Sequence, residues 1–101
     1  SRRKGTLMTK VIVQHDVADY DRWFAVFTEH EATRRQHGAT GHSIYRVVTD
    51  PNTVVIVNDF AAADGVQAFL EDPSLPAAME RGGVDGPPQM WIVEEADSKR
   101  Y

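Results

Sequence analysis

The stretch GHSIYRVVTDPNTVVIVNDF (residues 41–60) contains two runs of β-branched and aromatic residues separated by a turn sequence. Runs of this composition favour β-strands, and we expect strands over 41–50 and 53–60. Pro51 suits the first corner of a tight turn and Asn52 tolerates the second. The sequence therefore predicts that DPNT closes an antiparallel hairpin.

The segments on either side of this hairpin extend the pattern. KVIVQHDV (10–17) predicts a strand, and the helix after it is capped by Asp19 and ends near His37, at Gly38. After the hairpin, two short helices are separated by Pro73 and lead to a last strand over 89–95. The order β-α-β-β-α-β predicts an α+β, ferredoxin-like fold, with a four-stranded antiparallel sheet and helices on one face.

Two details of the second half refine this expectation. Ser74 stands where a helix N-cap is expected, directly before the helix that contains Pro76. VDGPP (84–88) is rich in glycine and proline, so we expect a rigid loop before the last strand.

Composition limits the classes of protein and of partner. The 101 residues suffice for one domain, predicted over 8–96, with a disordered arm or tag remnant over 1–7 and a polar tail over 97–101. The net charge of −4 and the lack of a basic stripe beyond SRRK argue against a nucleic-acid partner. Apolar runs are too short to span a membrane. Neither cysteine nor a secretory signal is present, and the expected compartment is the cytoplasm.

The central strands carry apolar side chains on both faces. Alternate positions of one strand are Val54 and Ile56 on one side and Val55 and Val57 on the other. The helices of so short a chain cover only one face, and burial of the other is worth roughly 25 cal/mol per Å². We therefore expect a homodimer that packs sheet on sheet. A monomer with an exposed apolar face is the alternative.

Three motifs resemble a known group of proteins: DYDRW at the start of the first helix, the broken helix LEDPSLPAAMERGGV, and the terminal GPP…W…EE. Over about residues 10 to 95 the chain is similar to small bacterial proteins of the dimeric α+β-barrel superfamily, near the antibiotic biosynthesis monooxygenase family. That superfamily includes monooxygenases, isomerases, cyclases, haem-degrading enzymes and effector-binding domains. The resemblance implies a ligand inside each protomer, between helices and sheet.

One face of the first helix changes character along its length. Its first half holds Tyr20, Trp23, Phe24, Val26 and Phe27, and its second half holds His30, Glu31, Arg34 and His37. The rings suit the wall of an apolar pocket, and the polar side chains suit the few polar groups that small-molecule sites carry. Alternatively, the helix projects past the sheet and leaves His30, Arg34 and His37 in solvent.

Other candidate site residues lie outside the first helix. His15, His42, Tyr45 and Asn58 are polar residues on strands, and a buried Asn58 amide needs a partner or a ligand. We expect His42 to be exposed. The remaining predicted substrate-binding side chains are apolar: Phe69, Met79 and Trp91.

No metal site and no cofactor are predicted. The four histidines lack the local spacings that mark zinc sites. The asparagine, tryptophan and histidine set of haem-degrading members of the superfamily is not recognisable at matching positions. No nucleophile elbow is present, which argues against a serine hydrolase.

Two functions from different classes remain open. The first is an enzyme that acts on a small apolar molecule, aromatic or polyketide-like, by cofactor-independent oxygenation or by a proton transfer such as cyclisation or isomerisation. His30 is the first candidate for the catalytic base and His15 the second, with Tyr45, Asn58 and Arg34 available to stabilise an oxyanion. The alternative is a non-catalytic small-ligand-binding or dimerisation module.

Overall fold

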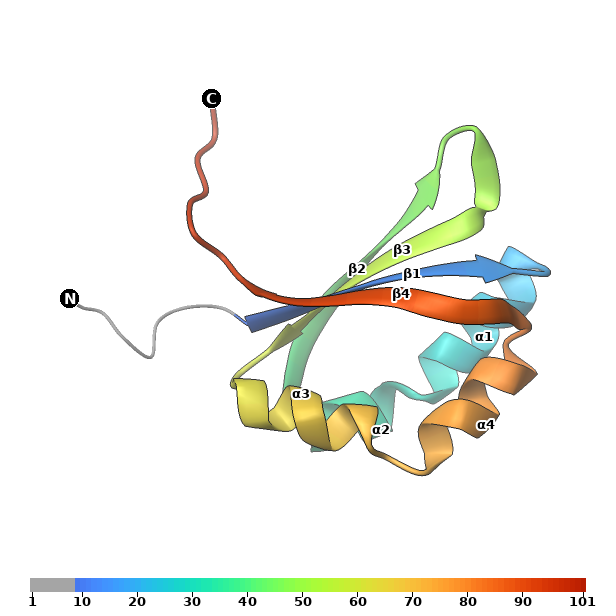
Figure 1. The fold of residues 1–101 in the computed structure, drawn as a ribbon, viewed down its shortest axis with the longest axis horizontal. Coiled ribbons are helices and arrows are strands. Elements are labelled where there is room, and N and C mark those ends of the chain that lie inside the picture. Colours follow the sequence, from blue (N-terminus) through green and yellow to red (C-terminus); the bar gives the residue numbers. More distant parts are fainter. Residues whose placement is uncertain (1–8) are drawn as a thin grey trace.

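The computed structural model describes residues 9–101, so the arm predicted over 1–7 lies outside the described residues. Its antiparallel sheet has the strand order β2-β3-β1-β4 (Figure 1). The strands are β1 (Thr9–Val17), β2 (Ala39–Val47), β3 (Asp50–Phe60) and β4 (Val84–Glu94). The first and third strands in the sequence occupy the centre, which confirms the predicted ferredoxin-like fold.

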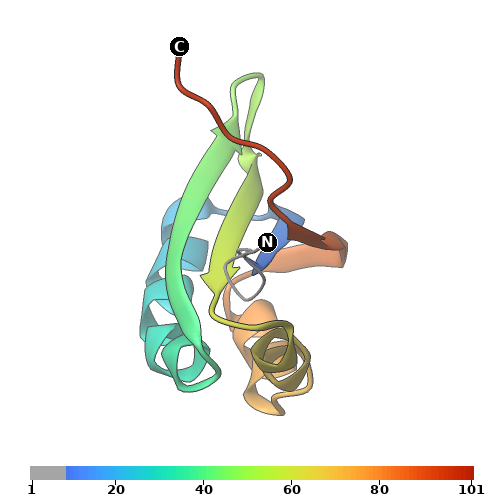
Figure 2. The same cartoon turned by 90° about the vertical axis from the view of Figure 1, so that its left-hand side faces the viewer.

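Four short helices lie on one side of this sheet and form two pairs (Figure 2). They are α1 (Tyr20–Glu29), α2 (Glu31–Gln36), α3 (Ala63–Leu70) and α4 (Ser74–Arg81). Asp19 caps α1 as predicted, because its carboxylate accepts a hydrogen bond of 3.0 Å from the backbone N–H of Arg22. The single first helix predicted from the sequence is in fact two helices, since His30 leaves helical geometry at φ −87° and ψ 3°.

The prediction of a tight turn at DPNT is wrong. The chain reverses at Val48 and Thr49, and Pro51 already belongs to β3. The pairing shifts by three residues between Arg46 and Val47, so that Pro51 lies in a bulge and its missing N–H breaks no ladder bond. The Nε atom of Arg46 donates a 2.8 Å hydrogen bond to the Pro51 carbonyl and holds this bulge in place.

The rigid loop predicted over 84–88 is also wrong, because β4 begins at Val84. Gly86 adopts φ +70°, and the pairing with β1 shifts between Gln14 and Asp16 at the same level. An edge strand tolerates proline and a bulge where a central strand does not. The position of β4 at the sheet edge therefore lets this proline-rich segment pair.

The core lies between the helices and the sheet in two clusters. One cluster consists of Val11, Phe60, Val66 and Phe69. The other consists of Val17, Trp23, Val54 and Ile56. In the part of the chain that the structure describes, no helix is long and apolar enough to cross a membrane.

The opposite face of the sheet carries a second set of apolar side chains, and none of the helices within residues 9–101 covers it (Figure 1). Strand pairing places Ile12 between Val57 and Trp91 on this outer face. Tyr45 and Val55 pair on the same face. Tyr45 is 57% exposed and Trp91 is 48% exposed.

Candidate functional site

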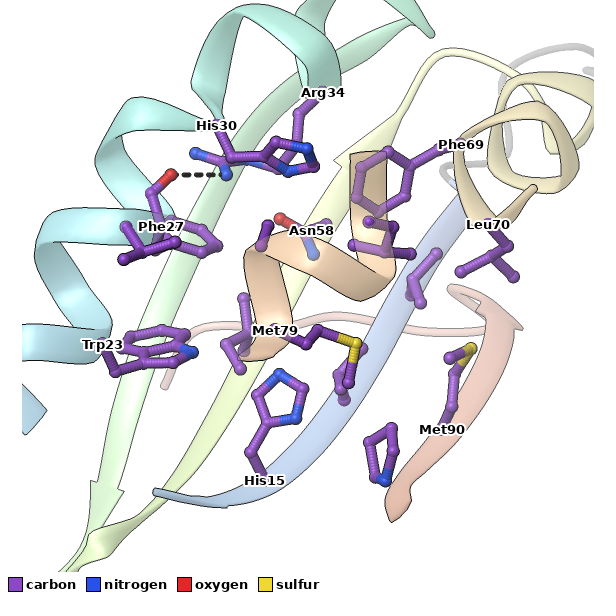
Figure 3. A pocket seen from close by; sticks show the side chains of 17 residues that line it. His15, Trp23, Phe27, His30, Arg34, Asn58, Phe69, Leu70, Met79 and Met90 are labelled. Carbon is purple, nitrogen blue, oxygen red and sulfur yellow. Dashed lines mark hydrogen bonds between the residues drawn. The ribbon is translucent and has the colours of Figure 1, made fainter. Parts of the chain in front are cut away.

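A cavity of about 90 Å³ lies between the two helical pairs and the sheet, and it is partly open to solvent (Figure 3). Its wall is mainly apolar, and polar side chains enter at a few points, as is usual in small-molecule sites. A single water molecule needs roughly 10–15 Å³ of cavity volume counted in the same way. The cavity therefore has room for several water molecules, or for a small ligand with about one ring.

Eight of the ten predicted site residues line this cavity: His15, Trp23, Phe27, His30, Arg34, Asn58, Phe69 and Met79. They come from β1, α1, α2, β3, α3 and α4, and from the break at His30. The sheet supplies the floor, α1 and α2 supply one wall, and α3 and α4 supply the other (Figure 3). The fold thus brings together side chains that are up to 64 residues apart (79 − 15).

Tyr45 and Trp91 do not line the cavity, contrary to the sequence-based expectation. Successive side chains of a strand point to opposite faces. Tyr45 is opposite Val55, and Trp91 is opposite Ile12, so both belong to the outer face of the sheet. They cannot contact a ligand that is enclosed in the cavity of the same protomer.

Aromatic rings form the wall contributed by α1. The ring centroids of Trp23 and Phe27 are 5.0 Å apart in a stacked arrangement. Phe24, also expected on the inner stripe, is 42% exposed and stacks on Tyr20 instead. Only part of the apolar stripe of α1, namely Trp23, Val26 and Phe27, therefore faces the cavity.

Arg34 is buried in the cavity wall at 3% exposure. Its Nη1 atom donates a 2.7 Å hydrogen bond to the Phe27 carbonyl, and its guanidinium carbon lies 3.6 Å from the centre of the Phe27 ring. Its Nη2 atom is buried and has no hydrogen-bond partner among residues 9–101. Burial lowers the pKa of Arg34 to about 10, with a smaller opposing effect of Glu31, so the side chain is a cation at neutral pH.

His30 is 9% exposed and takes part in a chain of hydrogen bonds that begins at the cavity. Its Nε2 atom lies 2.9 Å from the Oγ atom of Ser74. Ser74 Oγ lies 2.6 Å from Oδ1 of Asp72, and the Nε2 atom of His37 lies 2.8 Å from Oδ2 of Asp72. The alternative in which His30 and Arg34 project into solvent is therefore wrong.

These distances determine the tautomer of His30. A carboxylate only accepts hydrogen bonds, so the Ser74 hydroxyl uses its single proton to donate to Asp72. Toward His30 the hydroxyl can then only accept, and the proton of the neutral imidazole must be on Nε2. The Nδ1 atom, which has no partner within residues 9–101, keeps its lone pair. Neutral His30 is thus a base at Nδ1.

The electrostatic surroundings favour the neutral form of His30. Burial lowers the pKa of His30, the nearby Arg34 charge lowers it further, and Asp72 acts in the opposite direction. Hydrogen bonds from Ser74 and His37 hold the pKa of the Asp72 carboxyl well below its usual range. His30 is therefore unprotonated at neutral pH beside an aspartate that remains anionic.

His15 and Asn58 are buried at 9% and 5% exposure, and each has an atom with no hydrogen-bond partner in the described part of the chain: Nδ1 of His15 and Oδ1 of Asn58. Burial lowers the pKa of His15. Asn58 pairs with Val11 in the sheet, and Val11 is four residues before His15 on β1. At about 3.3 Å per residue, His15 and Asn58 are roughly 13 Å apart along the sheet.

His30 and Arg34 lie toward the opposite end of the cavity from His15, with Asn58 on the floor (Figure 3). The two candidate bases therefore face different ends of the cavity (Figure 3).

Sequence-based reasoning missed Asp72 and Ser74 as functional candidates. Ser74 was expected to cap α4, but the N-cap position is Pro73, and the Ser74 side chain bonds to Asp72 and His30 instead. The DPS sequence contains one signal of this arrangement, because Asp two residues before a helix start often accepts its backbone N–H, here at 2.9 Å. The contact with His30 has no local signal.

Within residues 9–101, no three His, Cys, Asp or Glu side chains are grouped so that they could hold a metal ion. Neither a protein-family model nor a curated protein matches the sequence. Comparison of structures is more informative, and the matches extend over nearly the whole chain.

A protein from Bordetella bronchiseptica, provisionally named an antibiotic biosynthesis monooxygenase, superposes with a TM-score of 0.74 at 16% identity, covering 93% of this chain and 100% of its own. A variant of SnoaB, a cofactor-independent oxygenase from Streptomyces nogalater, has a TM-score of 0.74 at 17% identity, with 90% and 95% covered. A Nitrosomonas europaea protein of unknown function gives 0.66 at 18%, with 97% and 98% covered. The chain thus has the ferredoxin-like α+β fold of antibiotic biosynthesis monooxygenase-like proteins, as its sequence motifs predicted.

Proposed function

We propose that the protein is an enzyme that binds a small apolar, aromatic or polyketide-like molecule in the cavity and removes a proton from it with His30. One observation carries this proposal: Asp72, acting through Ser74, leaves His30 as a neutral base at Nδ1 in the cavity wall, beside the buried cation Arg34. A base and an adjacent positive charge are what the formation of a substrate anion requires.

Two reactions can follow from such an anion. In an oxygenation, His30 removes a proton from an activated CH₂ group, and the carbanion forms a C–O bond with dioxygen, which is the oxidant. The peroxide anion recovers the proton from His30 and loses water, so that CH₂ and O₂ become C=O and H₂O. In an isomerisation or cyclisation, no oxidant takes part, and the imidazolium returns the proton to another atom of the substrate.

The fold of the neighbours supports the oxygenation, because one of them is a cofactor-independent oxygenase. Arg34 Nη2 is the donor that we assign to the developing oxyanion, since it is buried and unpaired. Tyr45, which was a third candidate for this role, is on the outer face of the sheet. His15 is the second candidate base and has the opposite end of the cavity within reach (Figure 3).

We also propose that two copies of the chain pack through the outer face of the sheet. Ile12, Val57 and Trp91 form an apolar row across three strands. The ion pair of Lys10 and Asp59, at 2.6 Å, lies on the same face toward one end of the strands and gives the apolar row a polar border. An apolar centre with a polar border is the usual composition of a protein interface.

Turnover of one-ring aromatic ketones and phenols that carry an activated CH₂ group, followed by oxygen uptake and product mass, tests the proposal. We expect His30→Gln to lower kcat by about 10²-fold or more. His42→Gln is the matched control, because His42 is exposed and does not line the cavity. Full activity of His30→Gln would refute the role of His30. Binding without any turnover would favour the alternative, a non-catalytic ligand-binding module.

A further inference from the structure

The cavity contains a positive charge, Arg34, that forms no ion pair within residues 9–101, and Glu31 offsets its burial only in part. The contacts of Arg34 are the Phe27 carbonyl and the Phe27 ring, both of which are uncharged. A buried ion without a partner is costly, and proteins rarely keep one unless something pairs with it. The missing partner is therefore to be sought in a ligand.

Only one of the two terminal nitrogens of Arg34 lacks a hydrogen-bond partner among residues 9–101. Nη1 is satisfied by the Phe27 carbonyl at 2.7 Å, whereas Nη2 is buried and unpaired. Arg34 is one of the cavity-lining residues, and in Figure 3 its guanidinium lies at the His30 end of the cavity. The carbonyl bond and the stacking on Phe27 hold the guanidinium in one orientation. Nη2 is thus a preorganised donor for an oxygen that carries negative charge.

The floor of the cavity adds a complementary requirement. Oδ1 of Asn58 is buried, unpaired and an acceptor. An unsatisfied buried acceptor is destabilising, and a hydroxyl or amine donor on a ligand would satisfy it. Arg34 and Asn58 belong to α2 and β3, so the fold brings a cationic donor and a neutral acceptor to the same cavity.

We propose that the ligand of this cavity is a small aromatic acid, bound as its anion, whose charged oxygen pairs with Nη2 of Arg34. A carboxylate and a phenolate or enolate share this chemistry. The apolar walls and the volume of about 90 Å³ fit a frame of about one ring. The inference rests on the proposed function only in using the same cavity, because it concerns binding and requires no turnover.

Fluorescence of Trp23 reports on this binding directly. The chain has two tryptophans, and Trp23 lines the cavity while Trp91 lies on the outer face. In a Trp91→Phe background, Trp23 is the single reporter. The probes are benzoate and 4-nitrophenolate as carboxylate and phenolate, and benzamide as a neutral molecule with nearly the shape of benzoate.

We expect at least one of the two anions to bind about tenfold or more tightly than benzamide. Arg34→Met and Arg34→Gln should remove this preference. Arg35→Met is the matched control, because Arg35 is the next residue, its side chain is 73% exposed, and the change in net charge is the same. It should retain the preference. The circular dichroism spectrum shows whether each variant is folded.

Three outcomes would overturn the inference: equal affinity for anions and benzamide, a preference that survives in both Arg34 variants, or no binding of either anion at millimolar concentration. Which anion binds distinguishes a carboxylate from a phenolate. The proposed function can fail separately. Binding of acids without turnover refutes the enzyme and keeps the inference, whereas turnover of neutral substrates without a preference for anions does the reverse.

Discussion

The Nε2 atom of His30 lies 2.9 Å from the Oγ atom of Ser74, a residue 44 positions further along the chain. His30 occupies the break between α1 and α2, and Ser74 is the first residue of α4. The contact therefore joins the two helical pairs that enclose the cavity. It also connects a cavity-lining imidazole with a carboxylate that does not itself line the cavity.

The contact between His30 and Ser74 should fix the tautomer of His30. In the wild-type protein at pH 7.5, ¹⁵N NMR should show neutral His30 in the single Nε2–H tautomer, because Ser74 can only accept. Ser74→Ala should give a mixture of tautomers and cost about 1 kcal/mol of stability. Ser43→Ala, an exposed serine on β2, is the control. An unchanged tautomer in Ser74→Ala would show that Ser74 does not position the ring.

Asp72→Asn tests the electrostatic part of the same arrangement. The negative charge of Asp72 raises the pKa of His30 against the lowering effects of burial and Arg34. Its removal should lower the pKa of His30 further, as measured by titration of the imidazole resonances. A pKa of His30 that rises or stays constant in this variant would contradict the prediction.

Stability should decrease as the pH falls below about 6.5. Burial lowers the pKa of both His15 and His30 in the folded state, so between the folded value and about 6.5 the unfolded chain binds more protons. Acidification within this window favours unfolding. The lowered pKa of Asp72 affects stability only at the more acidic pH values where carboxyl groups titrate. It therefore does not contribute to the change in stability at about pH 6.

Urea denaturation at pH 7.5 and pH 5.5 measures this effect as the difference in midpoint. In His15→Gln the difference should be smaller, because one of the two buried imidazoles is absent. His42→Gln is the control, since His42 is exposed. A wild-type midpoint that is higher at pH 5.5 than at pH 7.5 would contradict the expected direction of this pH dependence.

Arg34 should cost stability in the empty protein. Arg34→Met removes a buried, unpaired cation and retains most of its aliphatic length, so we expect an unchanged free energy of unfolding or an increase of up to about 1–2 kcal/mol. The lost hydrogen bond to Phe27 and the lost stacking limit the gain. Thermal and urea unfolding measure the change. A loss of several kcal/mol would indicate that the cation supports the fold.

Trp91 and Ile92 provide a test of the proposed dimer. They are neighbours on β4, are 48% and 51% exposed, and lie on opposite faces of the sheet. Trp91→Lys should place a charge in the interface and give monomers in sedimentation velocity experiments. Ile92→Lys, on the helix-covered face, should leave the dimer intact. A monomeric wild-type protein, or equal effects of the two changes, would refute packing through the outer face.

The order of elements and the cap at Asp19 could be predicted from local signals, because strand composition, a capping carboxylate and glycine at a helix end act within a few residues. Gly38 indeed has φ +98° at the end of the predicted helix. The prediction of a tight turn at DPNT was wrong because the backbone angle that proline favours suits a bulge in a hairpin as well as the first corner of a turn. The loop over 84–88 failed for a similar reason, since pairing at a sheet edge accommodates Gly86 and its proline neighbours.

The sequence by itself pointed to eight of the side chains that line the cavity, since polar residues on apolar faces are visible in the printed order. It could not determine the face of Tyr45 and Trp91, because a strand that is apolar on both sides carries no mark of which side the helices cover. Only the tertiary structure decided that Arg34 is buried with its Nη2 atom unpaired among residues 9–101 and that Ser74 contacts His30. Both facts depend on atoms from distant segments meeting, and neither segment carries a local preference for the contact.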